Sequence, residues 1–249
     1  SIISIKTYAK RLNIETKYDT NEPFIYLRDS GFFRCKFGQG FLIGDIGKIG
    51  PDYIPGHGHA DILSFELSLR NQRVLVNSGT SLYEESEERV RQRSTSSHNT
   101  VEIDGQSSSE VWKSFRVGRR AKPFDINIIK ENGNYYELSC SHDGYKYLNG
   151  RNLHQRTWIL SEGKLLVIDN IKGDYKKAVA RFFVHPSVLV HKNYLLLPNN
   201  NCKVTFECSG GEICIVESSW HPEFGICMPS KCIEVNMNSS ELKTVFNWS

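Results

Sequence analysis

The residues best suited to chemistry stand close together in the segment YIPGHGHAD, residues 53–61, where His57, His59 and Asp61 occupy alternate positions. Side chains two residues apart on an extended backbone point to the same side, so all three are able to converge on one ligand. A neutral imidazole binds a metal ion or moves a proton. The spacing therefore predicts a metal or proton-transfer site, and the alternative is that these are polar loop residues or hydrogen-bonded core histidines.

A third histidine, His98, follows in the segment RQRSTSSHNTVEIDG, and we expect it to begin a strand. Arg91 and Arg93 precede it, and a guanidinium neutralises a carboxylate through two parallel hydrogen bonds. These residues predict that a carboxylate-bearing substrate binds beside the histidines. The alternative for the arginines is the solvated face of a helix.

Strand patterns dominate the elements that must position these residues. In DILSFELSLR every second residue from Leu63 to Leu69 is apolar, which is the period of a half-buried antiparallel strand. The turn residues RNQR and the following VLVNSG predict a hairpin. Similar short runs recur along the chain, separated by Gly, Asn, Asp or Ser. We therefore predict an all-β fold, a large multi-sheet antiparallel β-sandwich in one domain over residues 1–249, with helices only near residues 4–12 and 83–93.

Composition excludes several classes of protein. A net charge of +3 over 249 residues is too small to indicate nucleic-acid binding, and no apolar run is long enough to span a membrane. The seven cysteines are odd in number and include no C-x-x-C pair, which argues against a zinc knuckle and a complete disulfide framework. The last five, between residues 202 and 232, are compatible with one or two bridges or with free thiols. The sequence begins without Met or a signal-peptide pattern, so we expect a piece of a longer chain.

Four successive segments carry a resemblance to a known family. GHGHADILSFEL, VLVNSGT, RSTSSHNTVEIDGQSSSEVW and HDGYKYLNGRNLHQRTWIL resemble, in order, the signatures of heparinase II/III-like polysaccharide lyases, over about residues 24–190. The resemblance implies that this chain is the C-terminal β-sandwich domain, whose partner is an N-terminal helical toroid absent from this sequence. It also implies cleavage of an acidic, uronic-acid-containing polysaccharide by β-elimination, in the periplasm, cell envelope or secreted space of a bacterium.

The resemblance also suggests roles for individual residues. His57 resembles the family's catalytic histidine, and His59 and His98 resemble two ligands of a metal, usually zinc. The third ligand in the family is an aspartate in a V-D-x-G-T context, where this chain has Asn77. An amide oxygen is a weaker donor than a carboxylate, so we expect at most weak zinc binding, of structural importance, through His59, Asn77 and His98. Asp61 either takes over as ligand or orients His59 through its second nitrogen.

Arg91, Arg93 and Tyr145 are predicted to bind the substrate. For Tyr145, which stands with His142 in the family-like segment HDGY, hydrogen-bonded packing between strands is the alternative, and the same holds for His154 and Arg156 in HQRTW. In the family, further catalytic groups lie on the toroid. We therefore expect the isolated domain to be catalytically silent.

Two other classes of function compete with the lyase. The first is a cupin-like metal enzyme, because H-x-H on a strand is typical of cupins. Their glutamate should follow after three or four residues, however, and Glu66 follows His59 after six. The second is a non-catalytic carbohydrate-binding or structural β-sandwich that serves capsule or O-antigen metabolism, a reading that Asn77 favours.

Overall fold

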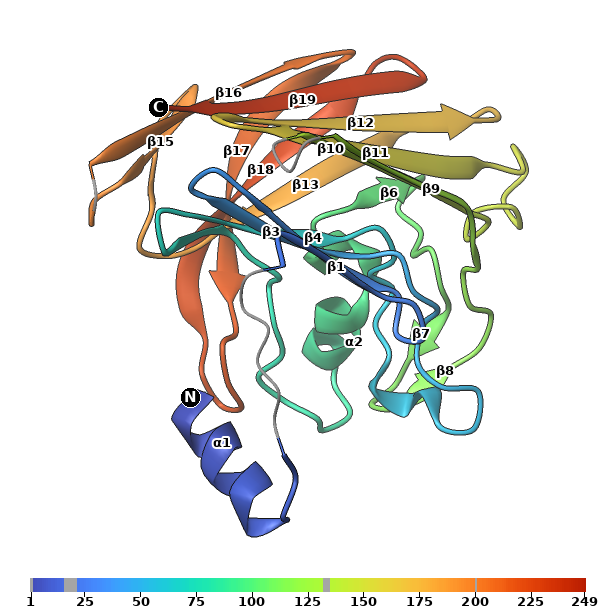
Figure 1. The fold of residues 1–249 in the computed structure, drawn as a ribbon. Helices are drawn as coiled ribbons and strands as arrows, with labels where there is room; N and C mark the ends of the chain where they lie inside the picture. The colour runs from blue at the N-terminus through green and yellow to red at the C-terminus, as the bar shows by residue number, and fades with distance from the viewer. Residues whose placement is uncertain (1, 16–21, 132–134, 200) are drawn as a thin grey trace.

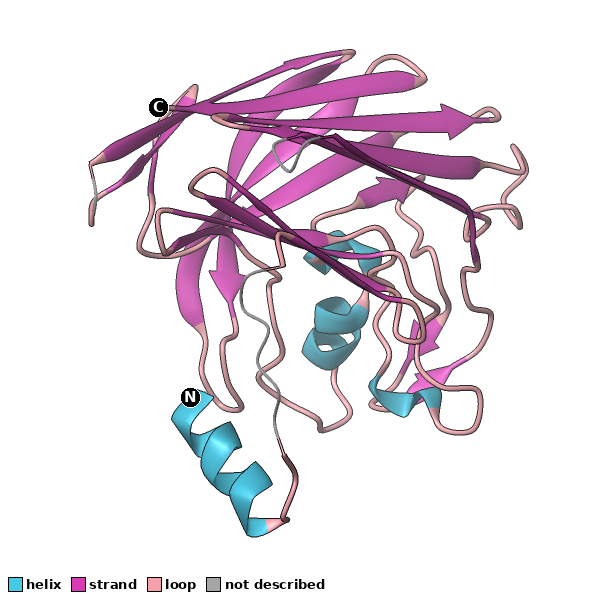
Figure 2. Cartoon of the chain, in the orientation of Figure 1, coloured by secondary structure: helices cyan, strands magenta, loops and turns pink. Residues whose placement is uncertain are grey.

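The computed structural model describes residues 2–15, 22–131, 135–199 and 201–249, and most of them lie in antiparallel strands arranged as two layers (Figures 1 and 2). The upper layer in Figure 1 is an eight-stranded sheet, and the lower layer is a nine-stranded sheet. Loops and short helices lie below the lower sheet, and the helix at the N-terminal end projects on the same side. The predicted all-β sandwich is confirmed.

The nine-stranded sheet is formed by two stretches of the chain that are far apart in sequence. Its first five strands are neighbours in sequence as well as in space, and they continue into strands from the second half of the chain. In spatial order the sheet consists of β1 (Phe24–Leu27), β2 (Phe32–Phe37), β3 (Gly40–Asp45), β4 (Phe65–Leu69), β5 (Gln72–Leu75), β13 (Ala178–Val184), β18 (Met228–Met237) and β17 (Gly211–Trp220), with β6 (Val101–Ile103) paired to β13.

The eight-stranded sheet covers the first one. Its order is β14 (Leu189–Val190), β15 (Tyr194–Leu197), β16 (Cys202–Ser209), β19 (Glu241–Trp248), β12 (Lys164–Lys172), β11 (Leu153–Ser161), β10 (Tyr135–His142) and β9 (Pro123–Glu131). A separate two-stranded sheet joins β7 (Val111–Trp112) to β8 (Arg116–Val117).

The helices are few and short. They are α1 (Ile2–Arg11), the 3-10 turn η1 (Pro55–His57), α2 (Glu87–Arg93) and the 3-10 turn η2 (Thr95–Ser97). Both predicted helices exist, but α2 begins only at Glu87, because the Ser86 side chain caps it by accepting a hydrogen bond from the backbone N–H of Arg89. The sequence 83–86 therefore precedes the helix.

The predicted hairpin is β4–β5, in which Leu69 pairs with Gln72 across a two-residue loop. Arg70 and Asn71 in this loop both have positive φ, 49° and 62°, as a tight hairpin turn requires. The strand itself begins at Phe65. Leu63 lies before it, is fully buried and has a φ of 63°, so the alternation of apolar residues extends beyond the strand.

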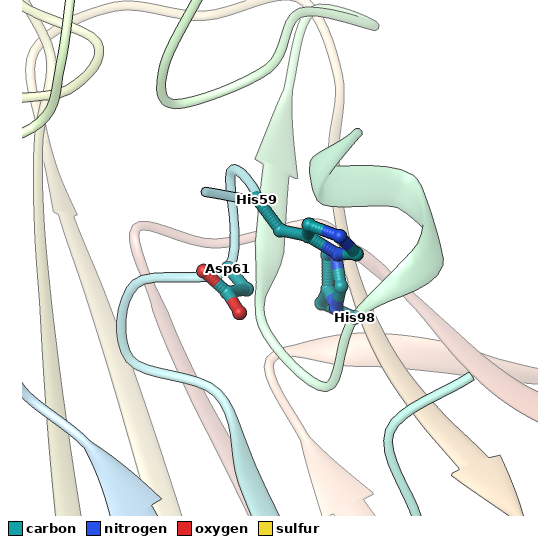
Figure 3. A group of neighbouring side chains, drawn as sticks. All are labelled: His59, Asp61 and His98. Carbon is teal, nitrogen blue, oxygen red and sulfur yellow. The ribbon is translucent and has the colours of Figure 1, made fainter. Parts of the chain in front are cut away.

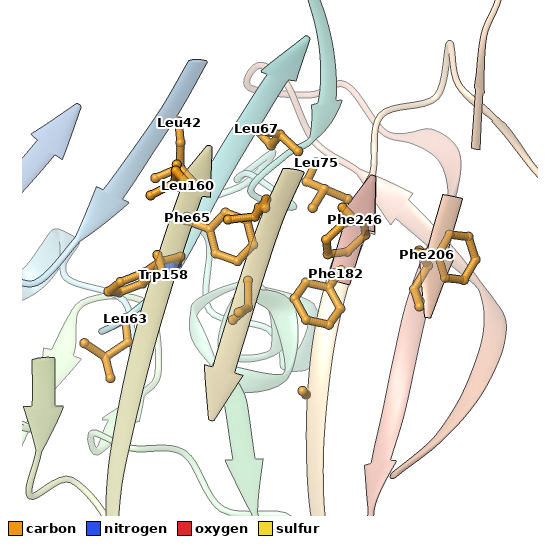
Figure 4. Close-up of a cluster of buried hydrophobic side chains, with 14 of the residues drawn as sticks. Leu42, Leu63, Phe65, Leu67, Leu75, Trp158, Leu160, Phe182, Phe206 and Phe246 are labelled. Carbon is orange, nitrogen blue, oxygen red and sulfur yellow. The ribbon is translucent and has the colours of Figure 1, made fainter. Parts of the chain in front are cut away.

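Aromatic rings from both sheets meet between the layers (Figure 4). Phe33 of β2 contacts Trp158 of β11 with ring centroids 5.2 Å apart, and Phe182 of β13 contacts Phe246 of β19 at 5.4 Å. Edge-to-face contacts of this kind add to the free energy gained from burying apolar surface. This core joins the two sheets into one body.

All seven cysteines are free thiols, so the bridges considered among the last five are not formed. Among the residues that the structure describes, no helix combines the length and the apolar character needed to cross a membrane.

Candidate metal and active site

The three predicted histidines lie in loops beneath the nine-stranded sheet. His57 ends η1, and His59 and Asp61 follow on the segment that leads into β4. His98 comes directly after η2 in an extended conformation and does not begin a strand, since β6 starts at Val101. A cavity of about 450 Å³ is lined by His57, His59 and Asp61.

His59, Asp61 and His98 form a cluster whose potential ligand atoms all lie within 4.8 Å of one another (Figure 3). The centroids of the two imidazole rings are 5.2 Å apart. His98 is fully buried, and neither of its ring nitrogens has a hydrogen-bond partner in the described part of the chain. Leaving a buried polar atom unpaired costs free energy, and a bound cation would remove that cost. Two imidazoles and one carboxylate are a donor set that suits zinc.

The electrostatics of the cluster favour the same interpretation. Burial lowers the pKa of His98 well below its usual value, and burial together with Arg89 and Arg93 lowers the pKa of His59 to about 3. Both rings are therefore neutral near pH 7, which is the form that binds a metal. Burial raises the pKa of Asp61, and the neighbouring carboxyl of Asp45 raises it further. A dication beside Asp61 would stabilise its charged form.

Asn77, the predicted third ligand, lines the same cavity. Its side-chain oxygen accepts a hydrogen bond from the backbone N–H of Gly79 at 3.1 Å. Asp61 instead has its carboxylate within the cluster of His59 and His98. Asp61 is therefore the candidate third ligand that the geometry favours, and Asn77 stays a prediction.

His57 is exposed and is not one of the three clustered residues, although it lines the same cavity. Its ring makes edge contacts with Tyr83 and Phe115 at centroid distances of 5.7 and 5.3 Å. Tyr83 in turn stacks on Phe224 at 5.8 Å. His57 is thus held at the edge of an exposed aromatic surface, with its imidazole available to a substrate.

The loop that carries His57 fits closely against its neighbours. Gly58 allows this approach, because a Cβ there would lie 2.6 Å from Ile49 Cγ2 and 3.1 Å from the Pro55 carbonyl oxygen. Arg93 holds the loop from the other side by donating to the Gly58 carbonyl at 2.9 Å and the Ser114 carbonyl at 3.0 Å. Since Arg93 is fully buried, the prediction that it binds substrate is replaced by a role in positioning His57.

Two other side chains that were predicted to bind the substrate form hydrogen bonds to groups of the protein. Arg91 donates to both carboxylate oxygens of Glu88 at 2.7 Å, within α2. Tyr145 is fully buried, and its hydroxyl donates to the Val101 carbonyl at 2.7 Å. The phenol therefore has no surface to offer a substrate, and its role here is structural.

Asn99 is an organising residue that the sequence did not single out. Its side-chain nitrogen donates to the carbonyls of Phe65 and Val76 at 2.7 and 3.1 Å, and its oxygen accepts from the backbone N–H of Phe183 at 2.7 Å. The buried side-chain amide of Asn99 thus connects β4, β13 and the residue before Asn77. Asn99 directly follows His98 in the sequence. The only signal in the sequence is its position next to that histidine.

Buried histidines form a second group, separate from the cluster. The backbone N–H of Gly144 donates to His142 Nδ1 at 3.0 Å, and His142 Nε2 lies 3.1 Å from His154 Nδ1. His154 Nε2 lies 2.7 Å from Asp169. Because His142 Nδ1 accepts, its other nitrogen carries the proton, and the chain of donors runs in one direction to Asp169. Hydrogen-bonded packing, the alternative considered for these strands, is the arrangement found.

Comparison with solved structures shows the fold. The heparan sulfate lyase HepC from Pedobacter heparinus aligns with a TM-score of 0.75 at 13% identity, covering 99% of this chain and 41% of its own. Two heparinase III structures each align with a TM-score of 0.73, at 17% and 16% identity. They cover 99% and 98% of this chain, and 39% and 41% of their own. The chain therefore spans about two-fifths of the length of these structures. No curated protein matches the sequence.

The match of the sequence to a family model is stronger evidence of relationship than the likeness to these solved structures. A family model described as heparinase II/III-like, C-terminal, matches residues 19–249, which is nearly the whole chain. The segments that bear His57, His59, Asp61 and His98 all lie within the match. This chain belongs to the heparinase II/III-like C-terminal domain family.

Proposed function

We propose that this chain is the C-terminal domain of a polysaccharide lyase that cleaves an acidic, uronic-acid-containing polysaccharide by β-elimination. The observation that carries the proposal is that exposed His57 lines one cavity together with His59 and Asp61, which cluster with the buried His98. Family membership and the likeness to heparan sulfate lyases support it. Heparan sulfate is accordingly the first substrate to test.

The reaction requires removal of the proton at C5 of the uronate and protonation of the departing O4. The imidazole of His57 is exposed and restrained by Tyr83 and Phe115, so it is placed to accept or give a proton at a sugar lying in the cavity. Restraint of this kind lowers the entropic cost of reaching the reactive geometry. The remaining acid–base group is expected from the part of the protein outside these 249 residues, so the domain alone should not turn over substrate.

Zinc fits the residues of the cluster, with His59, Asp61 and His98 as the side chains that would hold it. A bound zinc ion supplies positive charge and fixed coordination geometry. In this protein its role would be structural, because the cluster joins the loop after η1 to the segment after η2. The loop after η1 lines the cavity beside His57.

Activity of the full-length protein on heparan sulfate and on alginate tests the proposal, followed by ultraviolet absorbance of the unsaturated product. We expect the His57→Ala variant to lose on the order of 10²-fold or more in rate while staying folded. His191→Ala, at an exposed histidine outside the cavity, serves as the matched control. Full activity of His57→Ala would refute the assignment. Binding of these polymers by the wild-type protein without cleavage would favour the non-catalytic carbohydrate-binding alternative.

A further inference from the structure

The cavity at His57 adjoins a second cavity. The first, which we call the site cavity, measures about 450 Å³, and the second, the outer cavity, measures about 750 Å³. The residues common to both walls are Ser30, Phe32, Lys48, Gly50 and Pro51. Because the two cavities share these walls, they lie next to one another, with Lys48 on the wall of both, and we call the pair the groove. A groove of this extent suits several units of a polymer better than a single sugar.

Lys48 is the one cationic Lys or Arg side chain that lines the site cavity in the described part of the chain. It is exposed, and its ammonium forms no ion pair with any residue that the structure describes. The nearby guanidinium groups of Arg89, Arg91 and Arg93 do not line this cavity. Arg93 is buried against backbone carbonyls, and Arg91 is paired with Glu88. This leaves Lys48 as the group available to an acidic ligand in the cavity.

The backbone beneath Lys48 is fixed by close packing. Asp45 accepts a hydrogen bond from the Gly47 N–H at 2.8 Å, and the Ile46 N–H donates to the Gly31 carbonyl at 3.0 Å. Gly31 has a φ of 77°, and a Cβ on it would lie 2.1 Å from Gly47 Cα, so the two turns are in direct contact. The position of Lys48 relative to the groove is therefore set by the fold.

The other turn in this contact carries a second cation. Arg28 lines the outer cavity and is exposed. Acidic residues there are Asp29 and Asp52, of which Asp52 is paired with Arg120 at 2.7 Å. Lys48 thus lines both cavities and Arg28 lines the outer one, with Asp29 as the acidic group that partly offsets Arg28.

We propose that Lys48 binds the carboxylate of the uronate that lies beside His57, and that Arg28 gives a weaker contact to an acidic group further along the same polymer. The inference rests on the proposed function and adds a specificity-determining residue to it. An ammonium is a point charge with three donors, so it attracts a carboxylate without demanding one orientation. Pairing the carboxylate with a cation also makes the adjacent C5 proton easier to remove.

Kinetics of the full-length protein test this role. The acidic polymer is whichever of heparan sulfate and alginate the wild type cleaves. The reduced polymer is the same material after its carboxyl groups are reduced to alcohols. Lys48→Gln should lower kcat/KM on the acidic polymer by roughly 10- to 100-fold, the effect of one charge-assisted hydrogen bond. Lys48→Arg should restore most of it. Lys164→Gln, at an exposed lysine of β12 in the other sheet, should match the wild type. Arg28→Gln should cost less than tenfold.

A second measurement separates this inference from the proposed function. Binding of the reduced polymer, measured by calorimetry, should be weak and equal for the wild type and Lys48→Gln, because the group that Lys48 contacts is gone. If the wild type cleaves the acidic polymer and Lys48→Gln cleaves it equally well, the role of Lys48 is refuted while the lyase assignment stands. If the wild type cleaves neither heparan sulfate nor alginate, the lyase assignment fails and this inference fails with it.

Discussion

Arg156 and Asp169 form a fully buried ion pair across adjacent strands β11 and β12, with Arg156 Nε and Nη2 donating to the two carboxylate oxygens at 2.7 and 3.0 Å. The third nitrogen of the guanidinium, Nη1, donates to the backbone carbonyls of Leu63 and Asn99. These carbonyls lie two residues after Asp61 and one residue after His98. The pair therefore connects the interior of the sandwich to the two segments that carry candidate metal ligands.

Removing one member of this pair should be costly. Arg156→Met leaves the Asp169 carboxylate buried without its main partner, and breaking a buried pair in this way destabilises proteins by about 3–5 kcal/mol. Urea unfolding of the full-length protein, followed by tryptophan fluorescence, measures the change. Lys231→Met breaks an exposed pair with Glu217 and should cost under about 1 kcal/mol. An equal cost for the two variants would show that Arg156 contributes no more than a surface residue.

The histidine chain predicts how stability depends on pH. Burial lowers the pKa of His142 and of His154 in the folded protein, so the unfolded chain takes up protons that the folded chain does not. Stability should therefore be full above the unfolded histidine pKa of about 6.5 and fall as the pH drops below it. Each histidine contributes a slope of about 1.4 kcal/mol per pH unit.

Replacing one of these histidines isolates its contribution to the pH dependence of stability. In His142→Gln the slope of unfolding free energy between pH 6.5 and 4.5 should be smaller than in the wild type by about 1.4 kcal/mol per pH unit. Asp169 titrates outside this window. Burial raises the pKa of its carboxyl, but Arg156 and His154 outweigh burial and hold it at about 2. An unchanged slope in His142→Gln would contradict the buried neutral state.

The metal site makes a prediction that does not depend on activity. If Asp61 is the third ligand, Asp61→Asn should lower the zinc content of protein dialysed after zinc loading, as measured by mass spectrometry of the metal. Asn77→Ala should leave the content close to that of the wild type, because the Asn77 oxygen is bonded to the Gly79 N–H. The reverse result would restore Asn77 as the ligand and remove Asp61.

Gly58 offers a test of how tightly the His57 loop must fit. In Gly58→Ala the new methyl group would lie 2.6 Å from Ile49 Cγ2, and such overpacking typically costs about 1–3 kcal/mol. The loop should shift, and the rate on the acidic polymer should fall by more than tenfold. Ile49→Ala added to Gly58→Ala removes the contacted methyl group and should recover part of the rate. No recovery would locate the defect elsewhere, at the Pro55 carbonyl.

Much of the fold follows from local pattern, because strand periodicity and turn residues act over a few positions. The β4–β5 hairpin was predictable from the alternation in residues 63–69 and from the turn after it. His59 and Asp61 meet as their alternate spacing predicted, whereas His57 ends a 3-10 turn and leaves the alternation. Local spacing could not show this turn, which begins at Pro55.

The failures concern contacts between distant segments. Arg93 and Tyr145 were expected at the substrate, yet their partners are backbone carbonyls at Gly58 and Val101, which no local pattern reveals. The buried histidines depend on register, since His142 faces His154 across β10 and β11. Nothing in the segment around Lys48 marks it, because the two cavities that it lines are formed by stretches that are separate in sequence.

The position of β19 inside its sheet bears on how the protein is made. The segment Glu241–Trp248 lies between β12 and β16, and it pairs with both. During synthesis the ribosome produces these two neighbours long before the strand that joins them, so each presents an unpaired edge until then. Such edges invite association with other chains. The nascent domain therefore passes through a vulnerable period, and slowing translation near residue 240 should lengthen that period and increase aggregation.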